Sequence, residues 1–189
     1  MPSLSSFKSP ATYHLLSYGT LLGSTLFQSF IGGVVAYRAL PRAQFSTLQK
    51  SIFPPYFVLQ TVAPLALWIT YPRSLINALT SSPSAASAAA SAVAGTNDKR
   101  NAYLVATMLV TAVLNLVYVG PKTTEIMQVR KHQETRDGKK SWDAGPHSPE
   151  MQALNKQFAI LHSVSSIVNL IGLGAMVWYG AVLGEGLRL

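Results

Sequence analysis

Cysteine is absent from this 189-residue sequence, and charged residues make up only 12% of it. Without cysteine the chain has no disulfide, no thiolate nucleophile and no sulfur-ligated zinc or iron–sulfur centre. Soluble domains normally carry about a quarter charged residues to keep their surfaces hydrated. So few charges beside 49% hydrophobic residues indicate that water is not the only solvent of this chain.

Acidic residues are also few, at 7 Asp and Glu against 15 Lys and Arg, giving a net charge of +8. Nucleic-acid binding would need a compact basic stripe with interleaved aromatic residues, and the sequence has none. Its basic residues instead flank apolar segments, which is typical of membrane proteins facing anionic lipid headgroups. The expected partners are therefore the lipid bilayer and other membrane proteins, with no nucleic acid.

Four apolar segments are each long enough to cross the hydrocarbon core of a membrane as a helix with a rise of 1.5 Å per residue. They cover about residues 13–39, 54–71, 102–119 and 158–183. A helix satisfies its own backbone hydrogen bonds, as lipid requires. The sequence therefore predicts an all-α fold, a bundle of four transmembrane helices in one membrane domain over residues 1–189.

Prolines set several of the predicted helix ends. Pro41 cannot continue the first helix, and the pair Pro54 and Pro55 suits the first turn of the second. Pro64 lies inside the second segment, where it removes a backbone hydrogen bond. We therefore expect a bend near Ala63.

The connections differ in composition. A short polar hinge is expected over residues 42–51, and a Ser/Ala-rich connection over residues 74–100, either as a helix extension or as a mobile loop. The third helix is expected to end before residues 120–122, and residues 123–131 keep an amphipathic helical composition. A polar loop is then expected over residues 132–150.

The basic residues also predict the orientation in the membrane. With four spans, the first and third loops share one side, where ten Lys and Arg lie, against five on the side of the termini and the second loop. Cytosolic loops carry the excess of basic residues. The first and third loops are therefore predicted to be cytosolic.

The N-terminal residues 1–13 contain one lysine and no arginine, unlike an Arg-rich mitochondrial presequence. The first apolar segment is too long for the core of a signal peptide and is expected to be a retained helix. We expect an integral membrane protein of the endoplasmic reticulum or secretory pathway, with a mitochondrial membrane as the alternative.

Within the predicted spans there is no Asp, Glu or Lys, which removes the commonest groups of proton relays and ion-coupled transport. The polar side chains in or at the ends of the spans form a candidate intramembrane site. Its members are Gln28, Arg38, Gln60, Asn115, His162, Ser165, Ser166 and Asn169.

Four of these residues share one face of the last helix, because their spacing is i, i+3, i+4 and i+7. That face should contact the other helices, since unpaired amides in hydrocarbon cost several kcal/mol. By depth, His162 is expected to pair with Gln60 or Arg38, and Asn169 with Asn115 or Gln28. Two interpretations stay open: hydrogen bonds that hold the helices together, or a ligand site.

No metal and no cofactor is predicted. His14 and His162, the two histidines in the spans, lie at opposite ends of their helices in the predicted topology, so they are not expected to share a metal or haem. The sequence also lacks HExxH, GxSxG, a phosphate-binding Gly-rich loop and a dinucleotide fingerprint. These absences favour a protein that is not an enzyme.

Two pairs of glycines, Gly19 with Gly23 and Gly180 with Gly184, have the spacing that lets helix backbones approach closely. We expect them to serve packing inside the bundle rather than a homodimer face.

Three blocks of sequence, taken together, resemble one known family. They are residues 30–57, with Arg-x-Leu-Pro-Arg and Phe-Pro-x-Tyr-Phe; residues 120–127, with Pro-Lys-Thr-Thr; and residues 154–170, with His-x-x-Ser-Ser-x-x-Asn. Their order and content are similar to the transmembrane-protein-205-like family of small four-helix membrane proteins, over most of the chain. The resemblance implies a four-span protein of secretory and plasma membranes, associated with altered drug handling and without an established reaction.

Two functions are then expected from different classes. The leading one is a non-enzymatic membrane protein of this family, acting in membrane traffic, in transport support or as a component of a membrane complex. The alternative is a small transporter, or a lipid- or cofactor-binding protein, with its polar site near His162 and Asn169. A continuous polar cavity would favour the transporter or binding protein. A dry packed core would favour the role in membrane traffic, transport support or a membrane complex.

Overall fold

The computed structural model describes residues 7–72, 75–80 and 90–186. Every regular element within these ranges is helical, and no strand occurs there. The elements, two of them π-helical (η), are α1 (Pro10–Leu26), η2 (Phe27–Gly32), α2 (Gly33–Ala39), α3 (Arg42–Thr70), α4 (Leu75–Thr80), α5 (Ala90–Leu114), η3 (Asn115–Val119), α6 (Gly120–Asp137) and α7 (Pro149–Gly186).

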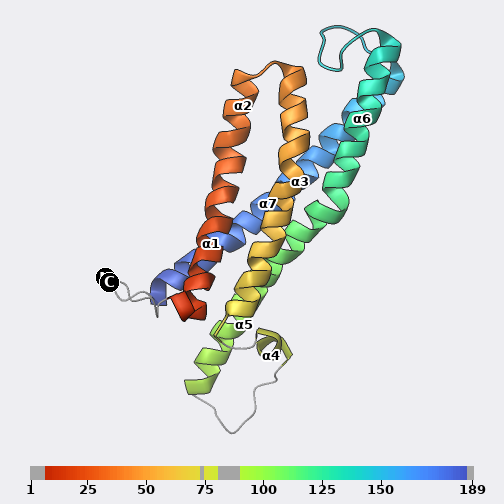
Figure 1. Ribbon diagram of the computed structural model, residues 1–189. Coiled ribbons are helices and arrows are strands. Elements are labelled where there is room, and N and C mark those ends of the chain that lie inside the picture. The colour runs from red at the N-terminus through yellow and green to blue at the C-terminus, as the bar shows by residue number, and fades with distance from the viewer. Residues whose placement is uncertain (1–6, 73–74, 81–89, 187–189) are drawn as a thin grey trace.

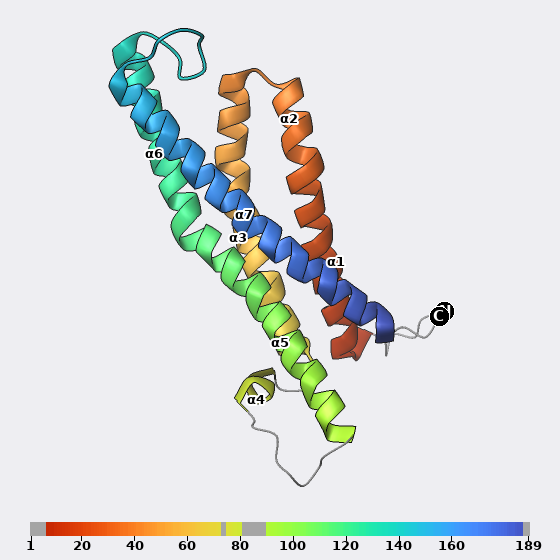
Figure 2. The ribbon, with the colours of Figure 1, turned by 180° about the vertical axis from the view of Figure 1, so that it is seen from behind.

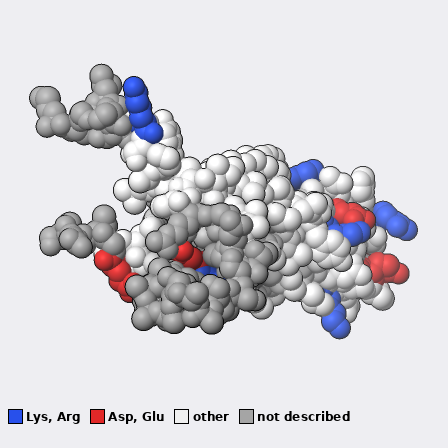
Figure 3. Space-filling model, turned by 90° about the horizontal axis from the view of Figure 1, so that it is seen from below, with Lys and Arg blue, Asp and Glu red and all other residues white. Residues whose placement is uncertain are grey.

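Several elements join end to end, so that four long helices result in the described part of the chain. They are Pro10–Ala39, Arg42–Thr70, Asn97–Asp137 and Pro149–Glu185, each long and apolar enough to cross a membrane. Seen from below, wide areas of the surface carry no charge (Figure 3). The predicted all-α architecture is confirmed, and the protein is an integral membrane protein.

The four helices form two hairpins. The connection between α2 and α3 and the connection between α6 and α7 lie at the same end of the bundle, while α1 begins and α7 ends at the other (Figure 1). Both views show the two hairpins diverging toward the end with the connections (Figure 2). This divergence determines where the candidate site lies.

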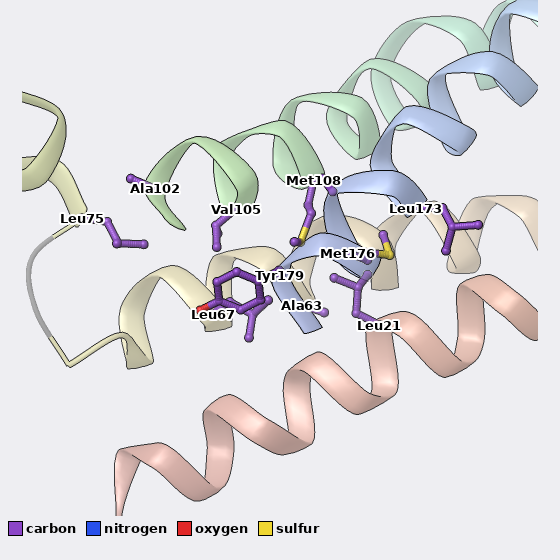
Figure 4. Close-up of a cluster of buried hydrophobic side chains, with 11 residues drawn as sticks. Leu21, Ala63, Leu67, Leu75, Ala102, Val105, Met108, Leu173, Met176 and Tyr179 are labelled. Atoms are coloured by element: carbon purple, nitrogen blue, oxygen red, sulfur yellow. The ribbon is translucent and has the colours of Figure 1, made fainter. Parts of the chain in front are cut away.

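The main hydrophobic core lies in the half of the bundle away from those connections. Leu21, Leu67, Met108 and Tyr179, one from each long helix, are completely buried there. Figure 4 shows their side chains converging, with Met176 of α7 among them. Close packing in this half holds the helices together, and it leaves the diverging half free to form a cavity.

Helix α3 begins earlier than the prolines predicted. It starts at Arg42, with Pro41 as its N-cap residue, and includes both Pro54 and Pro55 in its interior. The hinge expected over residues 42–51 is therefore wrong. Membrane helices tolerate interior proline because neighbouring groups satisfy the freed carbonyls. Pro64 also lies inside this unbroken helix, and the bend expected beside it stays a prediction.

The end expected for the third helix at Gly120 is also wrong, because the chain continues as helix through Pro121 to Asp137. Pro121 has no N–H, and its ring would clash with the carbonyl four residues earlier in a regular α-helix. The preceding turn is π-helical, and the N–H of Gly120 donates to the carbonyl of Asn115, five residues back. This wider turn carries the helix past the proline.

The remaining connections are shorter than expected. Residues 132–137 belong to α6, which ends at Gly138 in a left-handed conformation with φ of 62°, so the polar loop shrinks to residues 138–148. In the Ser/Ala-rich connection, residues 75–80 form the separate short helix α4, while residues 90–100 are the first part of α5, so only this second part is the expected helix extension. Residues 81–89 lie outside the described residues.

Candidate functional site

A cavity of about 940 Å³ lies between the two hairpins, in the half of the bundle where they diverge. One wall comes from η2, α2 and the first part of α3, and the other from α6, the following connection and the first part of α7. The lining of these walls includes apolar side chains, hydroxyls and amides. The apolar ones include Phe30, Phe53, Met127, Phe158 and Leu170.

An arginine lies over an aromatic ring on each wall. The guanidinium carbon of Arg42 is 4.2 Å from the centre of the Tyr37 ring. On the opposite wall, that of Arg130 is 4.5 Å from the centre of the Phe158 ring. The second arginine also donates from Nε to Oδ1 of Asn155, at 2.9 Å. Such cation–π contacts fix the long arginine side chains beside the cavity.

His162 extends the second of these stacks. Its ring is nearly parallel to that of Phe158, one turn earlier, with 5.9 Å between the ring centres and 6° between the planes. The side chain lines the cavity, and the residue is exposed. Its imidazole makes no hydrogen bond within the described part of the chain, so its ring nitrogens are accessible to a ligand.

Hydrogen bonds within α3 and between neighbouring helices hold the deep end of the cavity. Gln60 donates from Nε2 to the hydroxyl of Tyr56, at 2.8 Å, and to that of Thr25, at 3.2 Å. Asn115 donates from Nδ2 to Oδ1 of Asn169, at 3.1 Å. Tyr56 and Asn169 line the cavity, while both donor residues are buried behind it.

The connection between α6 and α7 closes over one side of the mouth. The buried carboxylate of Glu134 accepts hydrogen bonds from the backbone N–H and the hydroxyl of Ser141, at 3.1 and 2.6 Å. Lys140 lies 3.6 Å from the same carboxylate. These contacts fix the neighbouring Trp142 at the edge of the cavity.

The structure brings most of the predicted site together. Six of the eight predicted residues line the cavity, and they are Gln28, Arg38, His162, Ser165, Ser166 and Asn169. The other two, Gln60 and Asn115, support the cavity from behind. The predicted contact between Asn169 and Asn115 is confirmed.

The partners expected for His162 were wrong. Gln60 bonds with Tyr56 and Thr25 instead, and no hydrogen bond joins His162 to Arg38 within the described ranges. The reason is the divergence of the hairpins, which separates the α2–α3 wall from α7 at this level and leaves a cavity where direct contact was expected.

A buried polar cluster at the opposite end was missed from the sequence. His14 is 6% exposed, and its Nδ1 lies 2.9 Å from the hydroxyl of Thr70 while its Nε2 lies 2.8 Å from that of Tyr179. The hydroxyl of Tyr18 donates to the carbonyl of Met176 beside it. The spacing of His14, Tyr18 and Leu21 on one face of α1 was the available signal.

The glycine pairs serve packing less than expected. Gly180 contacts Tyr18 closely, but Gly19, Gly23 and Gly184 have open space where a Cβ would point. The expectation of internal packing is therefore wrong for the pair in α1.

Comparison with known proteins gives the family. The chain matches the family described as "Domain of unknown function (DUF4149)" over residues 16–132, and it belongs to this family. It is also similar to "Xanthocillin biosynthesis cluster protein D" of Aspergillus fumigatus, with 32% identity over 175 residues, covering 93% of this chain and 89% of the relative. No solved structure matches the chain.

Proposed function

We propose that this protein is a non-enzymatic membrane protein that binds a small amphiphilic molecule in the cavity between its hairpins, as a small transporter or lipid-binding protein. The observation that carries the proposal is the cavity itself, whose walls hold six of the predicted polar residues. Its volume of about 940 Å³ lies in the range of about 300–1,000 Å³ typical of small-ligand sites.

The construction of the walls supports binding rather than packing alone. A purely structural polar face would pair its groups with one another, as Asn115 and Asn169 do. His162 and Arg38 instead face the cavity without such pairing in the described residues. Functional polar groups within a membrane are kept at a cost in stability. This favours the ligand-binding alternative over a role in membrane traffic or as a complex component.

Two further points are part of the proposal. The relative named for a biosynthesis cluster supports a small organic molecule as cargo. The resemblance to the transmembrane-protein-205-like family supports a location in the endoplasmic reticulum or secretory pathway.

Native mass spectrometry in mild detergent tests the proposal. The variant Ser166→Phe places a large ring in the cavity, and Val164→Phe places the same ring on the outer face of α7, outside the cavity. We expect bound small molecules on the wild type and on Val164→Phe, and their loss from Ser166→Phe with unfolding temperature maintained. Equal occupancy of the two variants, or a wild type that binds nothing, would contradict it.

A further inference from the structure

The mouth of the cavity carries positive charge on both walls. Among the residues that the structure describes, six Lys or Arg residues line the cavity, together with one carboxylate, that of Glu134. The cations are Arg38, Arg42 and Lys50 on the α2–α3 hairpin and Arg130, Lys131 and Lys140 on α6 and its connection to α7.

Three of these cations are engaged by the protein. Arg42 and Arg130 lie over aromatic rings, and Lys140 pairs with Glu134. The other three, Arg38, Lys50 and Lys131, form no ion pair within residues 7–72, 75–80 and 90–186. Their charges therefore remain available at the mouth.

These available charges lie on opposing walls. Arg38 and Lys50 belong to one hairpin and Lys131 to the other, so the cavity separates like charges. Like charges that face each other beside a low-dielectric region repel, and an anion placed between them is attracted by both sides. Deeper in the cavity the described lining carries no charge and includes the apolar side chains of Phe30, Phe53 and Leu170.

We propose that the ligand is an acidic amphiphile. Its carboxylate or phosphate group lies between Arg38, Lys50 and Lys131, and its apolar part extends along the phenylalanines toward Asn169. This inference rests on the proposed function and specifies the ligand class. Two sources supply the same chemistry: a free carboxylic acid, or the phosphate head of a lipid.

Basic residues at this end would also attract anionic lipids to the outer surface of the protein. The control must therefore remove equal charge at the same end but outside the cavity. Arg136 and Lys156 meet this condition, because both are exposed and neither lines the cavity. The test pair is Arg38→Gln with Lys131→Gln, and the control pair is Arg136→Gln with Lys156→Gln.

Binding is measured by native mass spectrometry on the full chain with four probes that share an oleoyl tail. Oleate and oleoyl lysophosphatidic acid are acidic, while oleyl alcohol is neutral and oleoyl lysophosphatidylcholine is zwitterionic. For the wild type we expect at least one acidic probe to bind about tenfold more tightly than its matched control, a difference of about 1.4 kcal/mol, with the preference falling as salt rises. Preference for oleate alone identifies a free acid, and preference for the lysophosphatidic acid alone identifies a phosphate lipid.

The variants then locate the preference. The test pair should lose most of the preference for the acidic probe while keeping its unfolding temperature and its binding of oleyl alcohol. The control pair should keep the preference within about threefold, because its two charges lie outside the cavity and salt screens them from the bound anion. The charge-conserving pair Arg38→Lys with Lys131→Arg should retain the preference for the acidic probe. Equal binding of acidic and matched control probes, or equal loss in test and control pairs, overturns the acidic ligand. If none of the four probes binds, the proposed function fails as well.

Discussion

The side chains of Asn115 on η3 and Asn169 on α7 are joined by a 3.1 Å hydrogen bond between two membrane-spanning helices. Asn115 is completely buried, and its partner lines the cavity. The bond therefore connects the cavity wall to the core.

The energy of this bond can be measured with a double-mutant cycle of Asn115→Leu and Asn169→Leu. Each single variant should lower the unfolding free energy in detergent by about 1–3 kcal/mol, since it leaves one amide unpaired. The double variant should recover about 0.6 kcal/mol of the summed loss, the usual coupling of such a pair within membranes. Strict additivity of the two losses would show that the pair is not coupled.

His162→Gln separates ligand binding from stability. The imidazole makes no hydrogen bond within the described part of the chain and stacks only on Phe158, so we expect a change in unfolding free energy within about 0.5 kcal/mol. Ligand occupancy in native mass spectra should fall several-fold. His132→Gln, on the exposed surface of α6, should leave both quantities unchanged. A parallel loss of stability and binding in His162→Gln would mark the residue as structural.

Tyr179→Phe tests the buried cluster around His14. The substitution removes the hydroxyl that lies 2.8 Å from Nε2 of the histidine and leaves a buried nitrogen unpaired, so it should cost about 1–3 kcal/mol of unfolding free energy. Tyr103→Phe removes the same group from a side chain that is 63% exposed, and should cost little. Equal unfolding temperatures for the two variants would contradict the role given to the cluster.

Gly120→Ala tests the π-helical turn. A Cβ at this position would lie 2.7 Å from the backbone oxygen of Asn115 and 3.3 Å from the ring of Phe57. We expect a loss of about 1–3 kcal/mol from overpacking. At Gly174 a Cβ has open space, and Gly174→Ala should stabilise the helix by about 0.5–1 kcal/mol. Chemical denaturation in detergent compares the two, and equal effects would count against the tight turn.

The orientation is tested by protease accessibility in sealed vesicles. From the ten-to-five division of basic residues, we predict that the connection over residues 138–148 lies in the cytosol. A protease added to the cytosolic side should cleave there, after Lys139 or Lys140, and one confined to the lumen should not. Cleavage from the lumenal side alone would reverse the topology.

The sequence predicted the four spans because the length of an apolar segment is a local property. It also predicted the Asn115–Asn169 contact, since unpaired amides in lipid must find partners at the same depth. It was less successful at proline: Pro55 and Pro121 were expected to mark helix starts or ends. Whether a helix continues past a proline depends on a π-helical turn or on neighbouring helices, neither of which appears in the local pattern.

The cavity could not be predicted from the sequence, because it too depends on contacts that the local pattern does not show. His162 was given a partner on the assumption that the helices pack side by side along their whole length. Divergence of the two hairpins depends on many contacts in the opposite half of the bundle, such as that between His14 and Tyr179, which join residues far apart in sequence. The cluster around His14 was missed for the same reason.

Gly120 lies where the two hairpins come close together, at the start of α6. A side-chain atom here would touch Phe57 of α3, so the two hairpins meet closely at this level, and α6 then continues for 18 residues to Asp137. That length is about 27 Å at 1.5 Å per residue, so a tilt of roughly 5° about Gly120 would move the tip of α6 by about 2 Å. A rigid helix of this length would therefore turn a small change of packing at Gly120 into a larger displacement of its tip, and so into a change in the width of the cavity mouth.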